Sequence, residues 1–217
     1  MRVMFGARGC ARDAYWLWQE AFGAAAGIDL DLFIAADGAE EIGTAIRKVP
    51  IVGESAFLAE HADTPLEVYI GIGASGPRHA VVRKCRGALR HAHYPSLVHP
   101  SVRYDRRPDA SGFGAGLMLA AGSTLTTEVE LGDFVHVNLH CTVAHCARIG
   151  AYATLSPGCH VSGGVEIGEG CFLGAGVVIN ENLRIAAGVV IGSGAVVTRD
   201  LVEAGTYVGV PARRVDR

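Results

Sequence analysis

A histidine and a glycine lie eighteen residues apart in the second half of the chain, at His145 and Gly163. An imidazole can accept a proton from an attacking amine or hydroxyl, and a glycine leaves its backbone N–H open to a developing oxyanion. Asn138, seven residues before His145, could orient an acceptor group. These are the parts that acyl transfer needs, provided that the fold brings them together. A histidine on a protein surface is more often simply solvated, so the elements that carry His145 decide between the two interpretations.

A six-residue period runs through this region without a break. Every sixth residue is apolar, and the residue after each is small or polar. This period is typical of a hexapeptide β-helix, in which short strands point one large side chain inward and small residues turn the corners. The repeated positions are Phe113, Leu119, Leu125, Leu131, Val137, Val143, Ile149, Leu155, Val161, Ile167, Leu173, Ile179, Ile185, Ile191 and Val197.

Three such strands make one coil of about eighteen residues, and coils stack at the strand spacing of roughly 4.8 Å. The period therefore predicts that Gly163 lies directly above His145. It also predicts that His145 faces outward near a corner. His136, His140 and His160 are the other histidines of this region, and none of the four occupies an inward hexad position.

The first part of the chain has a different pattern, in which apolar strands alternate with helical segments. We expect strands at 2–7, 30–36, 49–53, 66–73 and 96–99, and helices at 13–26 and 78–89. Such alternation predicts a small parallel, Rossmann-like α/β sheet covered by helices. Gly6 and Gly9 flank the first strand-to-helix turn, where a phosphate can approach a helix N-terminus. Asp37, near the end of the second strand, could meet a ribose or a base, although such turns are as often purely structural.

Composition excludes several classes of protein. The net charge is −3 and no basic stripe is present, which argues against a nucleic-acid partner. No apolar run approaches the ~18 residues that span a bilayer. The N-terminus lacks the apolar core of a signal peptide, so we expect a cytoplasmic protein without a membrane partner. The six cysteines form no CxxC pair, and Cys141 and Cys159 are expected to be small core residues.

These features together resemble the left-handed β-helix acyltransferases. The resemblance rests on the hexads and on three motifs: 143–145 (VAH) with 149–150 (IG), 156–158 (SPG), and the tail 207–213 (YVGVPAR). The chain looks like the branch that acetylates nucleotide-linked amino sugars and sialic acids. The resemblance implies residues 1–95 as a nucleotide-sugar-binding α/β domain, 96–205 as an all-β left-handed β-helix, and 206–217 as a tail.

The resemblance also implies an activity and a site. The expected function is N-acetylation of a nucleotide-linked amino sugar, a cell-surface glycan precursor, with acetyl-CoA as co-substrate, no metal, and a homotrimer. His145 would be the general base, Gly163 would hold the thioester carbonyl, and Asn138 would contact the sugar. Acetyl-CoA would lie at a trimer interface near Gly174, Gly192, Gly209 and Pro211. The nucleotide would lie around Gly6, Gly9, Asp37 and Gly53.

Some positions depart from the pattern of that family. Cys146 follows His145, where an acidic residue is common, and Thr154 stands where a second histidine is common. Arg8 and Cys10 replace residues that are common in the glycine-rich turn of the family, which leaves the identity of the nucleotide open. Glu128, eighteen residues before Cys146, could supply the missing carboxylate from the coil below. The alternatives are that Glu128 is a solvated surface charge, that a backbone carbonyl orients the imidazole, or that nothing does.

Three other functions remain open from the sequence. The first is O-acetylation of a sialic acid or another sugar. The second is a zinc enzyme like the γ-class carbonic anhydrases, since His140 and His145 have the right spacing; Tyr104 stands where a third histidine ligand would be expected. The third is a non-catalytic trimeric scaffold that binds a sugar nucleotide.

Overall fold

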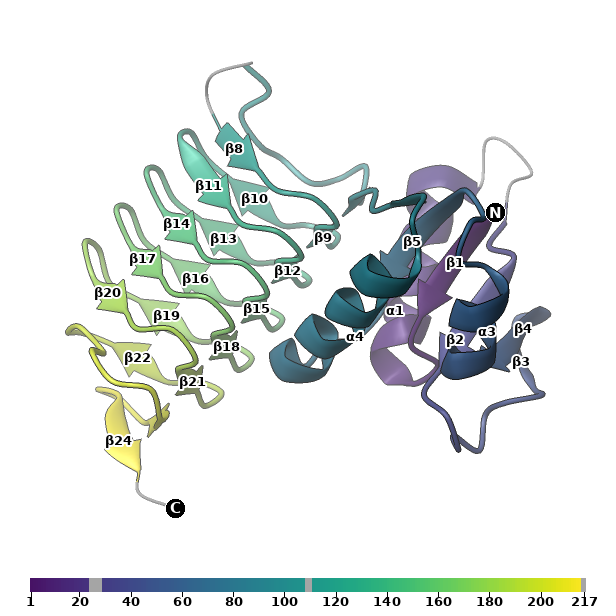
Figure 1. Cartoon of the computed structure of the whole chain (residues 1–217). Helices are drawn as coiled ribbons and strands as arrows, with labels where there is room; N and C mark the ends of the chain where they lie inside the picture. The colour runs from purple at the N-terminus through teal and green to yellow at the C-terminus, as the bar shows by residue number, and fades with distance from the viewer. Residues whose placement is uncertain (24–28, 108–110, 216–217) are drawn as a thin grey trace. The chain divides into compact units, whose positions relative to one another are not determined.

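The computed structural model describes residues 1–23, 29–107 and 111–215. The chain divides into two compact units, Met1–Leu97 and Val98–Arg217. Each unit has its own sheets, as Figure 1 shows. The last three residues of the predicted helix 13–26 lie outside the described residues.

The first unit is built on one small sheet. Its strands occur in the order β3-β4-β2-β1-β5-β6, and all neighbours pair in parallel except β3 with β4. The predicted parallel α/β sheet is therefore confirmed. The strands are β1 (Arg2–Phe5), β2 (Leu32–Ala35), β3 (Ala45–Ile46), β4 (Val49–Gly53), β5 (Leu66–Ile70) and β6 (Ala92–His93).

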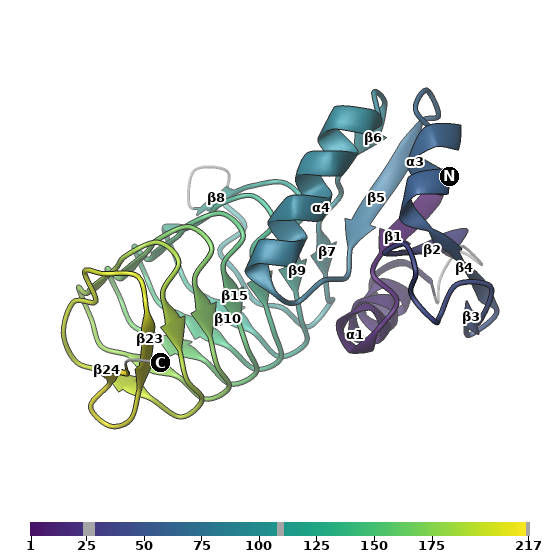
Figure 2. The same cartoon turned by 60° about the horizontal axis from the view of Figure 1, so that its bottom comes forward.

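Helices cover both faces of this sheet. Figure 2 shows α1 (Gly9–Trp18) on one face and α3 (Glu54–Glu60) with α4 (Ser75–Ala88) on the other. This arrangement follows from right-handed crossovers, because the chain moves one way from β1 to β2 and the other way from β4 to β5. A π-helical turn, η1 (Gln19–Gly23), extends α1. The helix α1 begins four residues before its predicted start, and α3 and the strands β3 and β6 were not predicted.

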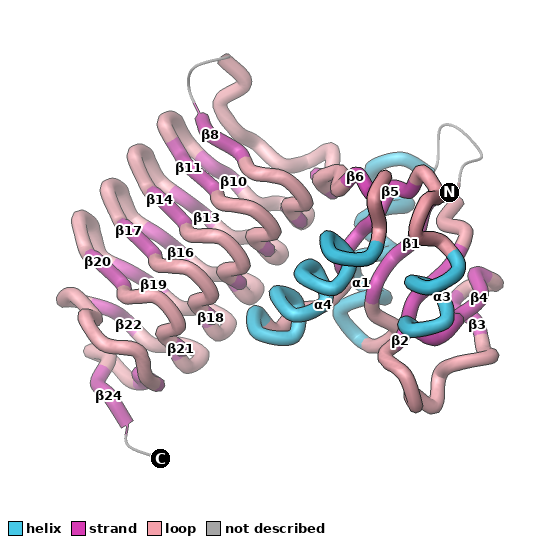
Figure 3. Tube along the Cα trace, in the orientation of Figure 1, coloured by secondary structure: helices cyan, strands magenta, loops and turns pink. Residues whose placement is uncertain are grey.

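The second unit is a β-helix whose strands are two or three residues long. Figure 3 shows the short strands separated by turns at every corner. One sheet holds β10 (Thr124–Leu125), β13 (Thr142–Val143), β16 (His160–Val161), β19 (Val178–Ile179) and β22 (Val196–Val197). A second holds β8 (Ser111–Phe113), β11 (Val129–Leu131), β14 (Arg148–Ile149), β17 (Glu166–Ile167) and β20 (Arg184–Ile185).

The third sheet of the β-helix extends to the end of the described chain. It holds β7 (Leu97–Val98), β9 (Met118–Leu119), β12 (His136–Val137), β15 (Thr154–Leu155), β18 (Phe172–Leu173), β21 (Val190–Ile191), β23 (Thr206–Val208) and β24 (Arg213–Val215). Residues 206–215, predicted as part of a tail, therefore add two strands to the sheet, with β24 antiparallel to β23.

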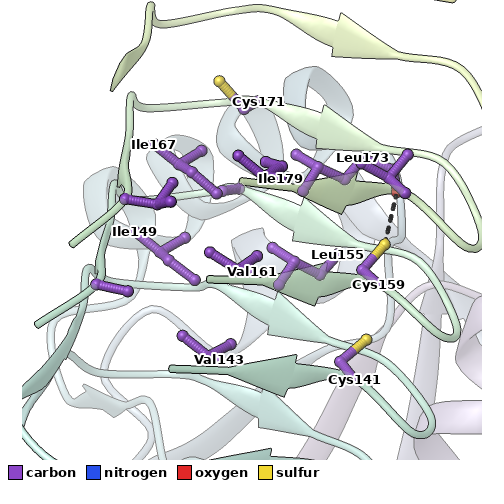
Figure 4. Packing of buried hydrophobic residues seen from close by; sticks show 14 of the residues in the cluster. Cys141, Val143, Ile149, Leu155, Cys159, Val161, Ile167, Cys171, Leu173 and Ile179 are labelled. Atoms are coloured by element: carbon purple, nitrogen blue, oxygen red, sulfur yellow. Dashed lines mark hydrogen bonds between the residues drawn. The ribbon is translucent and has the colours of Figure 1, made fainter. Parts of the chain in front are cut away.

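The hexads build the core as predicted. Each hexad residue from Phe113 to Val197 ends a strand, and all except the partly buried Phe113 are buried. Coils pair in an eighteen-residue register, as in Thr142 with His160. Figure 4 shows Val143, Val161 and Ile179 stacked in one column. Burying each such side chain contributes about 1.5–3 kcal/mol.

Cysteines fill small positions in the same core. Cys141, Cys159 and Cys171 are fully buried with free thiols. Their sulfurs lie 3.1–3.2 Å from the carbonyl oxygens of Ser156, Gly174 and Ala186, respectively. These three cysteines therefore serve as small apolar side chains that also give backbone carbonyls a weak donor.

The corners of the coils use left-handed backbone. The second residue of a corner turn has positive φ, even where it is not glycine. The non-glycine examples are Glu128, Phe134, His140, Cys146, Tyr152 and Asn182, with φ between 54° and 59°. This conformation costs an ordinary residue about 1–2 kcal/mol, so the stacked core must hold each corner in place.

Candidate active site

His145 lies in the corner turn after strand β13. Val143 is buried in the core, and the chain then turns outward through His145 and Cys146. Cys146 has φ +59°, which makes it the left-handed residue of this corner. The His145 side chain is exposed, and its imidazole has no hydrogen-bond partner among the described residues. The predicted outward position near a corner is therefore what the structure shows.

Gly163 lies against the His145 ring, one coil further along. A Cβ atom placed on Gly163 would lie 2.6 Å from both Cε1 and Nε2 of the imidazole. The backbone N–H of Gly164 donates to the His145 carbonyl oxygen at 2.9 Å. The N–H of Gly163 itself has no acceptor in the described part of the chain. The eighteen-residue spacing thus brings together an imidazole and an open backbone donor, as the sequence indicated.

Glu128 lies one coil before Cys146, at the same corner position. Its carboxylate accepts a hydrogen bond from the Cys146 thiol, with 3.2 Å between Oε2 and Sγ. This bond is the main reason why the pKa of the Cys146 thiol is raised. Within the described residues, Glu128 makes no hydrogen bond or ion pair with His145. The structure therefore places the carboxylate against the residue next to the histidine.

Asn138 lies at the corner that follows β12. Its side-chain Oδ1 accepts a hydrogen bond from the backbone N–H of Leu139 at 2.8 Å, which orients the amide. Its backbone oxygen accepts a bond from the Ser123 hydroxyl at 2.7 Å. The side-chain amide nitrogen has no acceptor among the described residues, so it can donate to a bound molecule. No hydrogen bond joins Asn138 to His145 in the same set of residues.

Gly174 and Gly192 lie in the same corner column as Asn138, two and three coils further on. A Cβ on Gly174 would lie 2.5 Å from the backbone nitrogen of Ser193, and one on Gly192 would lie 2.8 Å from Val208 Cγ1. Gly209, in the loop before Pro211, has φ +93°. Corner packing and backbone conformation are therefore sufficient reasons for glycine at these three positions. Contact of these glycines with acetyl-CoA remains a prediction.

A second candidate site is a cavity of about 670 Å³ in the first unit. It lies where β1, β2 and β5 end, and is lined by the segments that follow them, 6–8, 36–39 and 71–74. The chain runs from β1 to β2 in one direction and from β4 to β5 in the other. The crevice outside the carboxyl ends of strands at such a reversal is where α/β sheets bind ligands.

The first turn at this cavity needs glycine. Gly6 has φ +115°, and a Cβ there would lie 2.6 Å from the carbonyl oxygen of Gly71. The ends of β1 and β5 can approach each other this closely only because neither Gly6 nor Gly71 has a side chain. The helix α1 starts directly after this turn, and the first N–H groups of a helix have no intrahelical acceptor. This end of the cavity therefore suits an anionic group.

Asp37 also lines the cavity, but its oxygens already have partners. Oδ1 accepts the backbone N–H of Ser55 at 3.0 Å, and Oδ2 accepts the Ser55 hydroxyl. These two bonds lower the pKa of Asp37. Gly53 lies beside this pair, since a Cβ on it would lie 3.3 Å from Asp37 Oδ1. Of the four residues predicted at the nucleotide, Gly6 and Asp37 line the cavity, whereas Gly9 and Gly53 lie next to lining residues.

Sequence reasoning missed two acidic residues that line the same cavity. Glu54 is only 5% exposed and forms an ion pair with Lys84, with 3.0 Å between Oε2 and Nζ. Glu41 accepts a bond from Arg8, with 2.9 Å between Oε1 and Nε. Glu54 begins α3, a helix of seven residues that is too short to show a helical period. The only signal for it was a glutamate directly after a strand.

The described residues contain neither a cluster of metal ligands nor a membrane-spanning helix. No three histidine, cysteine, aspartate or glutamate side chains among residues 1–23, 29–107 and 111–215 are grouped as metal ligands. His140 and His145, the pair considered for zinc, therefore have no third ligand beside them there. In the same ranges, no helix has the length and apolar character needed to cross a membrane.

Comparison with known proteins agrees with the fold and the repeat. The model of the family described as bacterial transferase hexapeptide (six repeats) matches residues 146–181 and 164–199. A GDP-perosamine N-acetyltransferase of Escherichia coli O157:H7 is 35% identical over 69 residues, which are 31% of this chain and 29% of that protein.

Solved structures match over almost the whole chain. PerB from Caulobacter crescentus, solved with CoA and GDP-perosamine, is 28% identical with a TM-score of 0.86, covering 99% of this chain and 97% of its own. WeeI from Acinetobacter baumannii AYE is also 28% identical with a TM-score of 0.86, covering 99% of both chains. In its repeat and its fold, the chain is therefore similar to the hexapeptide-repeat acyltransferases with a left-handed β-helix.

Proposed function

We propose that this protein transfers the acetyl group of acetyl-CoA to the amine of a nucleotide-linked amino sugar. The observation that carries the proposal is the contact between the His145 ring and Gly163, since an imidazole beside an open backbone N–H supports acyl transfer. The names of the relatives support the substrates, because they act on or were solved with GDP-perosamine and CoA.

In the proposed reaction, the sugar amine attacks the carbonyl carbon of the acetyl thioester. His145 takes the proton that the nitrogen loses as the N–C bond forms. The N–H of Gly163 stabilises the negative charge on the former carbonyl oxygen. When the carbon–sulfur bond breaks, the electron pair leaves on the CoA sulfur, which receives the proton from the imidazolium. The products are the N-acetyl sugar and free CoA.

The other residues have supporting roles in this proposal. Asn138 donates its side-chain amide to the sugar, and acetyl-CoA lies along the corner column of Gly174 and Gly192 toward Gly209 and Pro211. Glu128 is a positioning residue, because it holds Cys146 and thereby the backbone next to His145. The nucleotide occupies the cavity of the first unit at Gly6, Gly9, Asp37 and Gly53.

The proposal includes an assembly and a place in the cell. We propose a homotrimer, because a β-helix of this size has three flat faces and because the terminal coils expose apolar side chains, with Val202 76% and Val210 72% exposed. We further propose that the enzyme serves polysaccharide biosynthesis and is located in the cytoplasm, because nucleotide sugars are made there. Light scattering of the purified protein tests the trimer, and a monomer at assay concentration would contradict it.

An acetyl-CoA turnover assay with a panel of acceptors tests the activity. The panel contains GDP-, UDP- and dTDP-linked 4-amino sugars together with free sialic acid. We expect one class of nucleotide amino sugar to be acetylated, and His145→Ala to abolish that activity while the protein stays folded. O-acetylation of sialic acid with no reaction at any nucleotide amino sugar would replace this proposal with its nearest rival. Turnover of none of them would favour the scaffold.

A further inference from the structure

Two carboxylate oxygens in the first unit are buried without a partner. Glu54 Oε1 and Glu41 Oε2 are inaccessible to solvent and have no hydrogen bond among the described residues. Both residues line the cavity at the ends of β1, β2 and β5. A buried oxygen left without a donor costs about 1–3 kcal/mol, and more when it is charged. A ligand in the cavity that brings hydrogen-bond donors would remove this cost, provided that the carboxylates turn toward it.

Asp37 has less need of such a donor than Glu54, because neither of its oxygens is without a partner. Both of its oxygens bind Ser55, which ties the end of β2 to the start of α3. Asp37, which the sequence analysis assigned to the nucleotide, is therefore also a structural link. Glu54, adjacent to Ser55 and 5% exposed, has the free acceptor.

The two glutamates lie at different parts of the cavity wall. Glu41 binds Arg8, which belongs to the turn that leads into the N-terminus of α1. Phosphates are expected at that helix end, so Glu41 suits the ribose that follows them. Glu54 is held by Lys84 of α4 and shares the lining with Ile72, Pro77 and Val81. These apolar side chains can cover a flat ring, so the base is expected beside Glu54.

We propose that Glu54 determines the specificity for the base and that the base is guanine. The ionised carboxylate can only accept hydrogen bonds, and it has about four lone-pair sites, so the bond from Lys84 leaves room for two more. Guanine offers two adjacent donors, N1–H and the N2 amino group. Uracil and thymine offer one N–H between two carbonyl oxygens, which a carboxylate repels. Adenine has an acceptor at N1. This inference rests on the proposed function, because it assigns the nucleotide of that substrate.

Binding of free nucleoside diphosphates tests the inference apart from catalysis. Isothermal titration of the purified protein with GDP, UDP, dTDP and ADP should give the tightest binding for GDP. Inosine diphosphate differs from GDP only in lacking the N2 amino group, so it should bind about ten- to a hundredfold more weakly, the loss of one hydrogen bond to a charged group. This comparison needs no variant. Equal binding of GDP and inosine diphosphate, or tighter binding of UDP or dTDP, would overturn the inference.

Variants locate the effect. Glu54→Gln should weaken GDP by about ten- to a hundredfold and reduce the ratio between GDP and inosine diphosphate toward one, since the coupling between the carboxylate and the N2 amino group is lost. Glu41→Gln is the matched control, and should weaken GDP, UDP, ADP and inosine diphosphate by a similar factor because ribose is common to these four. An unchanged ratio in a folded Glu54→Gln protein would assign the preference to another residue.

The two proposals fail in different ways. If UDP or dTDP binds best and the corresponding amino sugar is acetylated, the assignment of Glu54 is wrong and the enzyme function stands. If GDP binds with the expected dependence on N2 and on Glu54, yet no GDP-linked amino sugar is acetylated, the base assignment stands and the function is wrong.

Discussion

Replacing Gly163 with alanine tests the central contact of the proposed site. The new Cβ would lie 2.6 Å from Cε1 and Nε2 of His145. Ordinary contacts between such atoms are about 3.5–4.0 Å, so the ring must move by about 1 Å. The atoms in the way belong to an exposed side chain that can rotate, and the φ of Gly163 is not in the left-handed region. The fold should therefore tolerate the methyl group while the imidazole leaves its position.

A displacement of 1 Å costs on the order of a hundredfold in catalysis. We therefore expect kcat of Gly163→Ala to fall by about a hundredfold, with unfolding free energy changed by less than about 1 kcal/mol. Turnover can be measured by the fall in absorbance of the acetyl-CoA thioester. This readout is preferable to a thiol reagent for free CoA, because the exposed Cys146 would react with such a reagent. Gly112→Ala is the matched control, because its Cβ would make an ordinary 3.6 Å contact with Glu130 Cγ. Activity of Gly163→Ala within threefold of the parent, with the control also active, would refute the reasoning.

Three further predictions follow from the same contacts. His145→Gln should lower kcat by about a hundredfold or more, the contribution of a general base, and circular dichroism should show an intact β-helix; parental activity would exclude His145 as the base. Glu128→Gln should lower kcat by about tenfold with little change in the KM for acetyl-CoA, whereas Cys146→Ser, which keeps a donor toward the carboxylate, should stay near the parent; the reverse order would show that Glu128 has no positioning role. The hydrogen bonds from Ser55 lower the pKa of Asp37 from its usual 3.8, so its stabilising effect is present above that value and is lost as pH falls through the lower folded pKa. Urea unfolding between pH 2 and 6 should show this acid-dependent loss in the parent and a smaller one in Asp37→Asn, and identical pH dependence would contradict it.

The β-helix could be predicted residue by residue because its signal is repeated. Fifteen hexads in one phase fix which side chain points inward at every strand, and the same phase places Gly163 over His145. Coil stacking also predicted that Glu128 lies on the face of Cys146, and the two are hydrogen-bonded. Periodicity does not determine which way a long side chain turns. The hydrogen bond from the Cys146 thiol to Glu128 could therefore be found only in the structure.

The first unit shows where sequence patterns become insufficient. The strand Val49–Gly53 was predicted with its observed bounds, since it is a short apolar segment ending in glycine. The helix α3 that follows it has seven residues, so it offered no period to detect. Without α3, neither the bond between Asp37 and Ser55 nor the burial of Glu54 could be anticipated. Both depend on a contact between segments eighteen residues or more apart in a region without a repeat.

The eighteen-residue register limits how this chain can change in length. The pairs Thr142 with His160 and Val143 with Val161 fix the corner at which Gly163 meets His145. Removing or adding a single residue between those strands would rotate the later corner and put a different backbone group beside the imidazole. Insertions can survive there only as loops that leave and re-enter at one corner. Whole coils, in contrast, can be gained or lost beyond Val197, so lineages of such enzymes are free to differ in length while the corner of His145 and Gly163 stays intact.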